Sequence, residues 1–320
     1  MPATPTSRMR RALGAIALTT VLALTGCAAQ VSSAETTAPS SKDAVVKTLY
    51  GNVTVPPSPK RVVALDFPES TALADLGIKP VGIGSYTPDL PYYTSFLKGV
   101  PDVTDKSGQP SLEKIAAVKP DLIVMDSFTT DIEKNRAVYE ELTAIAPTVV
   151  LKWTQAAGNW QEDAAGTAKA VGESAQLAKL KSTFEANAAA IKKKYAGLLA
   201  KETVDLVSGD ASSWYLYGRT SSHGRVLAEA GARFGAAATQ KDGFVQYSPE
   251  RYDVLKDTGI VIVDAATGAA AKTVTDSPVF TTIGAAKNDQ VFTTPYFFPS
   301  SYRIANALLD DFASALKHAK

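Results

Sequence analysis

The sequence predicts an α/β protein made of two Rossmann-like α/β lobes that are joined by a long backbone helix. Short, continuous apolar runs of β-type residues alternate with helical patterns, which is typical of a parallel sheet covered on both faces. The alternation is interrupted by a long helical stretch and then starts again. The part of the chain that can fold is about 280 residues long, which is enough for two ordinary domains.

The elements of the first lobe follow from local residue chemistry. Apolar β-type runs predict strands at Arg61–Leu65, Val81–Gly84, Asp121–Met125 and Thr148–Leu151. An early proline and a glycine stop at Gly77 predict a helix over Pro68–Leu76. Ser111 is placed to cap a short helix, and a further helical pattern covers Asp131–Ile145.

Two helical patterns fill the connecting segment. The first runs from Trp160 to Val171 and is broken by Gly172. The second runs from about Ser174 to Ala200 and carries apolar residues on one face at three- and four-residue spacing. At 1.5 Å per residue the second helix is about 40 Å long, which is more than one small lobe needs. We therefore expect it to bridge two lobes; the alternative is a long surface helix of one lobe.

The second lobe repeats the pattern of the first. Strands are predicted at Val204–Val207, Gly259–Val263 and Gln290–Phe292, and helices at His223–Ala230 and Ser301–Lys317. A further helix is predicted to open at Ser248-Pro249-Glu250 in the manner of a capping box, with Pro at its first position. The aromatic stretch Trp214–Tyr217 is expected to lie in a loop that leads to Arg219.

The start of the chain has the layout of a secretory signal peptide, with three arginines followed by a short apolar run over Ala12–Leu24. The order Leu24-Thr25-Gly26-Cys27 resembles the lipobox of bacterial lipoproteins. This resemblance implies that the thiol of Cys27 is lipidated and that Cys27 begins the mature protein. Cys27 is the only cysteine, so no disulfide can form within the chain. The alternative is an ordinary signal peptide that happens to contain a cysteine.

These patterns divide the chain into five parts. We expect a signal peptide over residues 1–26, a flexible tether over 27–44, an N-terminal α/β lobe over 45–160, a helical segment over 161–201 and a C-terminal α/β lobe over 202–320. The tether is rich in Ser, Thr and Ala and cannot bury enough apolar surface to fold.

Composition excludes several classes of function. From Cys27 onward the chain carries 30 basic and 32 acidic residues, so its formal charge is −2. A nearly neutral chain argues against a nucleic-acid partner, which would require a basic surface. Two histidines and a lipidated cysteine make a zinc site improbable. No stretch after the leader is long and apolar enough for a transmembrane helix.

Matching phrases in the two lobes carry a resemblance to a known family. The phrases are "PKRVVAL", "LADLGIKPVGIGSY" and "SLEKIAAVKPDLIVMD" in the first lobe, and "SPERYDVLKDTGIVIVD" and "AAKNDQVF" in the second. Together they resemble the helical-backbone (class III) substrate-binding proteins of ABC importers, which carry ferric siderophores, haem and vitamin B12. The resemblance covers about residues 45–320, which is nearly the whole mature chain.

The resemblance implies a lipoprotein on the outer face of the cell membrane that captures a ferric siderophore and delivers it to an ABC permease and its ATPase subunits. It implies a binding protein, not an enzyme, without a cofactor, and we expect a monomer that contacts the membrane only through its lipid. Ligands of open α/β sheets lie beyond the carboxyl ends of the strands, so two facing sheets predict a ligand cleft between the lobes.

Strand ends, loops and the resemblance give the candidate site residues. Aromatic side chains can cover the organic shell of a siderophore, and Arg or Lys can neutralise its oxygens. The candidate ligand-binding residues are Phe67, Tyr86, Tyr92, Lys152, Trp153, Trp214, Tyr215, Arg219, His223, Tyr296, Phe298, Tyr302 and Arg303. The excess of aromatic over basic candidates favours a hydroxamate or mixed siderophore. The resemblance also implies that Glu113 and Glu250 dock the protein onto its permease.

Other ligands and one other class of function remain open at this point. Haem would need an axial ligand, which His223 could supply, and cobalamin is a third choice. For a siderophore we expect no direct bond between protein and iron, His223 being the one candidate for such a bond. A secreted α/β hydrolase is a remote alternative, because the chain lacks a G-x-S-x-G elbow at a strand-to-helix turn.

Overall fold

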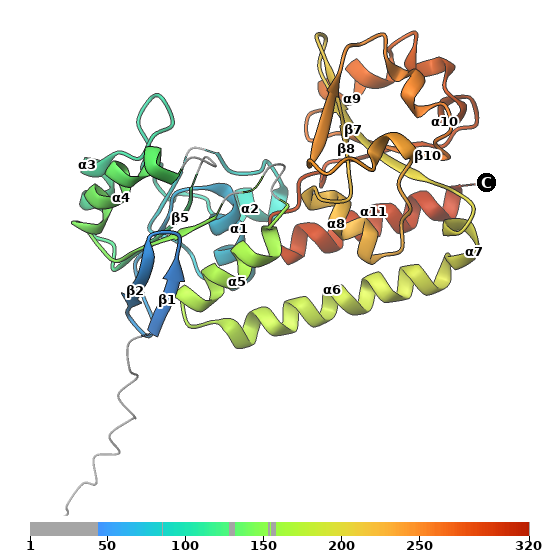
Figure 1. Ribbon diagram of the computed structural model, residues 1–320. Coiled ribbons are helices and arrows are strands. Elements are labelled where there is room, and N and C mark those ends of the chain that lie inside the picture. The colour runs from blue at the N-terminus through green and yellow to red at the C-terminus, as the bar shows by residue number, and fades with distance from the viewer. Residues whose placement is uncertain (1–43, 85, 128–131, 153, 155–157, 320) are drawn as a thin grey trace, which may run out of the picture. The chain divides into compact units, whose positions relative to one another are not determined.

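The computed structural model describes residues 44–84, 86–127, 132–152, 154 and 158–319 (Figure 1). They belong to one compact unit, Ser41–Lys320. The predicted signal peptide, Cys27 and all but the last residue of the predicted tether lie outside the described residues. Within the described ranges, none of the helices combines the length and the apolar character needed to cross a membrane.

The first lobe is built on a four-stranded sheet in which every pairing is parallel. Its strand order is β4 (Gly82–Ile83), β3 (Val62–Ala64), β5 (Leu122–Asp126) and β6 (Thr148–Leu151). The side chains of β3, β5 and β6 are buried, as the continuous apolar runs predicted for a sheet covered on both faces. The structure therefore confirms the predicted fold class for this lobe.

The helices of this lobe are α1 (Phe67–Asp75), α2 (Pro91–Phe96), α3 (Leu112–Ala117), α4 (Arg136–Thr143), which follows the 3-10 turn Ile132–Asn135, and α5 (Trp160–Ala170). Ser111 caps α3 as predicted, because its side chain accepts a hydrogen bond from the backbone N–H of Lys114 at 3.5 Å. An antiparallel hairpin of β1 (Ala44–Thr48) and β2 (Gly51–Val55) precedes these elements and was not predicted.

The second lobe has a mixed sheet of five strands. Its order is β11 (Val291–Thr294), β10 (Ile260–Asp264), β7 (Val204–Gly209), β8 (Trp214–Tyr217) and β9 (Phe244–Tyr247), and β8 and β9 pair antiparallel. The loop predicted at Trp214–Tyr217 is therefore wrong. This stretch forms a strand because alternate side chains fill the core: the ring of Trp214 stacks on Tyr247 and Tyr252, with centroids 4.8 and 4.6 Å away.

The helices of the second lobe are α8 (Ser222–Glu229), α9 (Gly268–Thr275), α10 (Gly284–Lys287) and α11 (Tyr302–His318), with 3-10 turns at Ala236–Ala238, Tyr252–Leu255 and Phe280–Thr282. The helix predicted to open at Ser248 is wrong. The Ser248 hydroxyl donates to the Glu250 carboxylate at 2.7 Å instead of accepting a backbone N–H, and Glu250 lies in a turn before the 3-10 turn.

Helix α6 (Ser174–Lys194) joins the lobes, and α7 (Ala196–Leu199) follows after a break at Tyr195. Leu177 and Leu180 pack against the cores of both lobes, and Phe184 is buried in the core of the second. Figure 1 shows α6 running beneath α5 of the first lobe and α8 and α11 of the second. The structure therefore confirms the bridging helix, although α6 is shorter than predicted. The domain boundaries given above stay a prediction.

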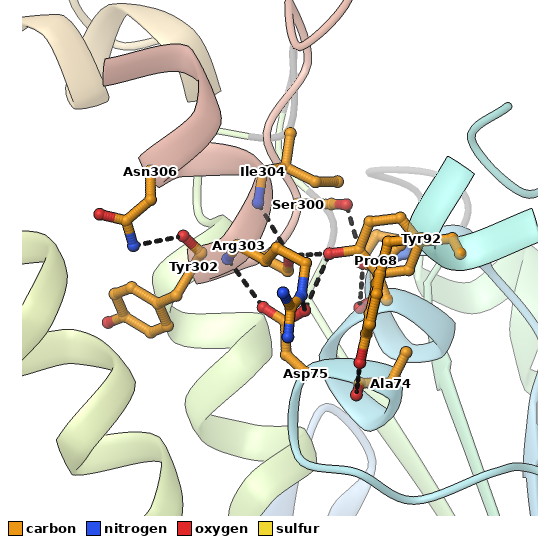
Figure 2. A network of polar contacts seen from close by, with 12 residues as sticks. Pro68, Ala74, Asp75, Tyr92, Ser300, Tyr302, Arg303, Ile304 and Asn306 are labelled. Carbon is orange, nitrogen blue, oxygen red and sulfur yellow. Dashed lines mark hydrogen bonds and ion pairs between the residues drawn. The ribbon is translucent and has the colours of Figure 1, made fainter. Parts of the chain in front are cut away.

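A second connection, which we call the interlobe joint, consists of Thr71, Asp75, Tyr93, Ser300, Ser301 and Arg303 (Figure 2). Tyr93 donates its hydroxyl hydrogen to Asp75 at 2.8 Å, and its oxygen lies 2.7 Å from that of Ser301. The backbone N–H of Arg303 donates to the second carboxylate oxygen of Asp75 at 2.8 Å. The start of α11 is thus fixed to the end of α1.

Candidate ligand-binding cleft

Two pockets lie where loops of the two lobes meet, and we call the first the basic pocket. It has a volume of about 570 Å³. It is lined by Thr154, Gly158, Asn159, Arg219, Thr220, Arg225, Lys241, Asp242 and Gly243. The first three residues come from the segment between β6 and α5 of the first lobe, and the others from the second lobe. The basic pocket therefore lies between the lobes.

The second pocket, which we call the aromatic pocket, has a volume of about 240 Å³. It is lined by Phe67, Tyr86, Thr87, Pro88, Asp89, Leu90, Ala266, Thr267, Pro295, Tyr296, Phe298 and Ile304. Residues up to Leu90 follow β3 and β4 of the first lobe, and residues from Ala266 onward follow β10 and β11 of the second. Both sets lie beyond the carboxyl ends of parallel strands, where an open α/β sheet binds its ligand.

The cations of the basic pocket differ in their partners. Arg225 forms two hydrogen bonds of 3.1 Å to the carboxylate of Glu162 and donates to the carbonyl of Gly158. Arg219 and Lys241 are exposed, and neither side chain forms an ion pair with a described residue. Arg225 thus links the lobes through its contacts with Glu162 and Gly158. Arg219 and Lys241 can instead neutralise the oxygens of a ligand.

The aromatic pocket presents ring faces at its mouth. Tyr86 is 64% exposed, and its ring meets that of Phe67 edge to face at 5.1 Å. Tyr296 and Phe298 are half-buried on the opposite wall. An exposed tyrosine supported by a second ring offers a rigid apolar surface with a polar end, which suits a ligand that has both characters.

Behind Phe298 lies a closely packed group of rings. His223 is fully buried, with its ring centroid 4.2 Å from that of Phe297, 4.5 Å from Tyr217 and 5.1 Å from Phe298. Its Nε2 atom has no hydrogen-bond partner among the described residues. Burial holds the pKa of His223 well below its ordinary value, so its imidazole is neutral at physiological pH.

The first lobe holds a group of acids: Asp66 and Asp126 at the carboxyl ends of β3 and β5, Glu69 on α1 and Asp163 on α5. Burial, and then the charge of Asp126, raise the pKa of Asp163 to about 8. Burial also raises the pKa of Glu69 well above its ordinary value, and neither of its carboxyl oxygens has a partner among the described residues. Asp163 is therefore protonated at neutral pH.

No three of the described His, Cys, Asp and Glu side chains are grouped so as to hold a metal ion. Two of the buried acids, Glu69 and Asp163, have a pKa that burial raises. One of them is connected to the basic pocket: the Asn159 amide donates to Asp163 at 2.6 Å and to the carbonyl of Lys152. The protonation of Asp163 is thus linked to a residue on the pocket wall.

The structure places five of the residues predicted to bind ligand on the walls of the two pockets. Phe67, Tyr86, Tyr296 and Phe298 line the aromatic pocket, and Arg219 lines the basic pocket. These residues come from the start of α1 and from three separate loops. The placement of the four aromatic residues follows from the rule that ligand residues lie at the carboxyl ends of parallel strands. Arg219 instead follows β8, which pairs antiparallel with β7.

Other predicted residues lie elsewhere. Trp214, His223 and Tyr302 are at most 2% exposed, so they have almost no surface with which to contact a ligand here. Tyr302 packs against the rings of Trp160 and Phe184, at 5.0 and 5.7 Å. All three are aromatic side chains that are buried in the protein core. Ligand contact by them stays a prediction that their burial does not favour.

Tyr92 and Arg303 lie at the interlobe joint. The guanidinium carbon of Arg303 stands 3.7 Å from the centre of the Tyr92 ring, and its Nε lies 3.4 Å from Asp75 (Figure 2). Tyr215 is half-buried against Phe244, and Lys152 is exposed beside the basic pocket. Trp153 lies outside the described residues.

The sequence reasoning missed several residues of the pocket walls. Asp89 and Thr267 lie in loops after predicted strands, so a wider search beyond the strand ends would have found them. Lys241 and Asp242 precede β9, a strand that was not predicted, and no local pattern points to them. The predicted docking residues Glu113 and Glu250 are both exposed, Glu113 in the first turn of α3.

Comparisons with known proteins agree with the two-lobed architecture. The family model described as periplasmic binding protein matches residues 62–296. The chain is 34% identical over 206 residues to a Bacillus subtilis protein named "Probable siderophore-binding lipoprotein YfiY", an alignment that covers 62% of this chain and 60% of that protein's length. It is 28% identical to the Fe(3+)-citrate-binding protein YfmC of B. subtilis, with 88% of each chain covered.

Among solved structures, the siderophore periplasmic binding protein from the fuscachelin gene cluster of Thermobifida fusca superimposes with a TM-score of 0.73. It is 24% identical and covers 82% of this chain and 98% of its own. This likeness shows the fold. Because the family model matches well over half of the sequence, the chain belongs to the periplasmic binding protein family. The family is one of binding proteins, which agrees with the expectation that the chain is not an enzyme.

Proposed function

We propose that this chain is the membrane-anchored receptor of an ABC importer and that it captures a ferric siderophore in the cleft between its lobes. The observation that carries the proposal is the pair of pockets, one basic and one aromatic, formed by both lobes of a periplasmic binding protein. Their chemistry matches a ferric siderophore, which has an apolar organic shell around polar oxygen donors.

The balance of charges favours a hydroxamate or mixed siderophore. Arg219 and Lys241 are the uncommitted cations among the residues that line the two pockets. A highly charged catecholate or a citrate complex would call for more positive charge than these two side chains provide. The rings of Phe67, Tyr86 and Phe298 suit the apolar shell of a hydroxamate chelate.

The proposed ligand is tested by tryptophan quenching of the purified protein against ferric hydroxamates, ferric catecholates, ferric citrate, haem and cobalamin. The proposal requires saturable quenching with the highest affinity for a ferric hydroxamate or mixed siderophore. Binding of haem or cobalamin in preference to every iron chelate would make the chain a receptor for a different ligand. No saturable binding of any ligand in the panel would refute the proposal.

We further propose that Cys27 carries the lipid anchor on the outer face of the cell membrane. The support is the sequence Leu24-Thr25-Gly26-Cys27 at the end of the leader, together with the word lipoprotein in the name of one relative. Mass spectrometry of the membrane-extracted protein should find an acylated N-terminal peptide that begins at Cys27. An unmodified peptide that begins upstream of Cys27 would contradict the anchor.

Docking onto the permease is assigned to Glu113 and Glu250, one on each lobe. Both side chains are exposed, and the Glu250 carboxylate is held by the Ser248 hydroxyl, which lowers its pKa and keeps it ionised. Surface charges of this kind orient a partner more than they add affinity. The double reversal Glu113→Arg with Glu250→Arg should abolish uptake while ligand affinity and thermal stability stay unchanged. Uptake at the wild-type rate would assign these residues to local structure alone.

A further inference from the structure

The charge of the aromatic pocket is negative, which the proposed capture of iron chelates does not explain. Asp89 lines the pocket, and no Lys, Arg or His is among the described residues that line it. Burial, and then the negative charges of Asp264 and Asp66, raise the pKa of the Tyr86 hydroxyl. Asp66 belongs to the first lobe and Asp264 to the second, so acids from both lobes face this tyrosine.

These three carboxylates lack cationic partners within the described part of the chain. Asp66 accepts the backbone N–H of Phe67 at 2.7 Å, and its side chain also bonds to Asp126. Asp264 accepts the backbone N–H of Ala266 at 2.8 Å. Asp89 accepts only a long hydrogen bond, 3.4 Å, from the Thr94 hydroxyl. Asp89 is exposed, and Asp264 is half-buried, which raises its pKa. Both side chains keep surface with which to meet a cation that enters the pocket.

Arg303, which could supply an internal counter-charge, already has other partners. Arg303 directly precedes Ile304, which lines the pocket. Its guanidinium group lies over the Tyr92 ring, and its Nε is 3.4 Å from Asp75 at the interlobe joint. Arg303 therefore neutralises Asp75 and leaves the acids of the aromatic pocket without a counter-charge.

Rings and carboxylates together make a recognition site for an organic cation. The faces of Tyr and Phe rings attract an ammonium group, and nearby carboxylates add a charge-assisted hydrogen bond. The volume of about 240 Å³ corresponds to roughly eight water molecules, which is room for a short alkyl chain with its ammonium group. The basic pocket has the opposite character, because Arg219 and Lys241 line it.

We propose that the aromatic pocket binds a protonated amine arm of the iron chelate while the oxygens of the chelate face the basic pocket. This inference rests on the proposed function and narrows its substrate class to ferric chelates that carry a primary amine. A chelate with a free carboxylate on that arm would place like charges against Asp89 and Asp264. The site therefore selects between two siderophores that share one iron-binding core.

A matched pair of ligands tests this. One is a linear ferric trihydroxamate that ends in an aminoalkyl arm, and the other is its N-acetyl derivative, which has the same core without the charge. At pH 7 and low salt the purified protein should bind the amine form about tenfold more tightly, and the preference should shrink as salt is added. The double variant Asp89→Asn with Asp264→Asn should bind both forms equally.

The control is Asp310→Asn, which changes an exposed acid on α11 that lies on neither pocket wall and should keep the tenfold preference. Equal affinity of the wild type for both chelates, or a preference for the acetylated one, overturns the amine site while the proposed function stands. A preference that survives in the double variant overturns the assignment to this pocket. If the protein binds no iron chelate of any class, it is the proposed function that fails.

Discussion

The interlobe joint and the cleft are both formed by the two lobes, but polar side chains have partners at the joint and lack ionic partners in the cleft. At the joint, the buried carboxylate of Asp75 accepts from Tyr93 and from the backbone of Arg303, and the hydroxyl of Thr71 lies 2.8 Å from that of Ser300. In the cleft, Arg219, Lys241 and Asp89 have no ionic partner among the described residues. Partnered groups fix the lobes to each other, and unpartnered groups at the surface are available to a ligand.

The largest effect is expected at the joint. Asp75→Ala should lower the free energy of unfolding by about 3 kcal/mol, because it leaves a buried tyrosine hydroxyl and a backbone N–H without their acceptor. Urea denaturation followed by circular dichroism measures the change. Asp310→Ala, on the exposed face of α11, is the control and should shift stability by less than about 0.5 kcal/mol. A loss below about 1 kcal/mol for Asp75→Ala would mean that the joint is not a stabilising contact.

Substitutions of Arg219 in the cleft and Arg303 at the joint test whether the two regions have different roles. Arg219→Ala should weaken binding of the best iron chelate by about 1–3 kcal/mol, since it removes a charge-assisted contact in the basic pocket. Arg303→Ala should leave that affinity within about twofold and lower stability instead, because its contacts are to Asp75 and Tyr92. Isothermal titration calorimetry on both variants makes the comparison. Weaker binding in Arg303→Ala alone would reverse the two assignments.

Glu69 gives a matched contrast with Asp75. Both acids are on α1 and buried, but Glu69 has no hydrogen-bond partner among the described residues. Replacing it with Met, which has a similar volume, should raise the free energy of unfolding by about 1–2 kcal/mol, because a buried polar group without a partner is lost. Chemical denaturation at pH 7 measures this. A destabilised Glu69→Met variant would show that this acid has a structural partner after all.

The sequence predicted the parallel sheet of the first lobe well, because its strands are continuous apolar runs buried on both faces. The prediction from sequence was wrong for β8. The aromatic residues of Trp214–Tyr217 are compatible both with a loop that lines a pocket and with a strand that packs on one side. The stretch forms a strand because it pairs with β9, and β9 is a separate segment of the chain whose pairing could not be predicted from local sequence. The joint was missed for the same reason: Tyr92 and Arg303 are far apart in the sequence, and only the fold brings them together.

Those two residues were assigned to the ligand because tyrosine and arginine are the types that a binding site uses. The types that bind a charged ligand also form buried interlobe contacts, so residue type alone could not separate the two uses. Phe67, Tyr86 and Arg219 lie on pocket walls because each follows a strand or precedes a capped helix, and their contact with a ligand stays a prediction. Position relative to strand ends was therefore a better guide than residue type.

The smallest effect concerns the pH dependence of stability. The folded state holds the proton of Asp163 up to about pH 8, whereas the unfolded chain releases it near its ordinary value of 3.8. The folded state thus binds more protons between these values, and the stability from Asp163 is lost as the pH rises toward 8. Asp163→Asn cannot ionise, so between pH 6 and pH 7 it should gain about 1 kcal/mol relative to the wild type. Parallel pH profiles in both proteins would refute the raised pKa.

The central claim is that the ligand lies between the lobes, with the aromatic pocket on one side and the basic pocket on the other. A crystal of the protein with a ferric hydroxamate, measured at the iron absorption edge, locates the iron atom directly. We predict one anomalous peak in the cleft, with the chelate in contact with both Tyr86 and Arg219. An iron peak outside the cleft, with both side chains still exposed to solvent, would contradict the account.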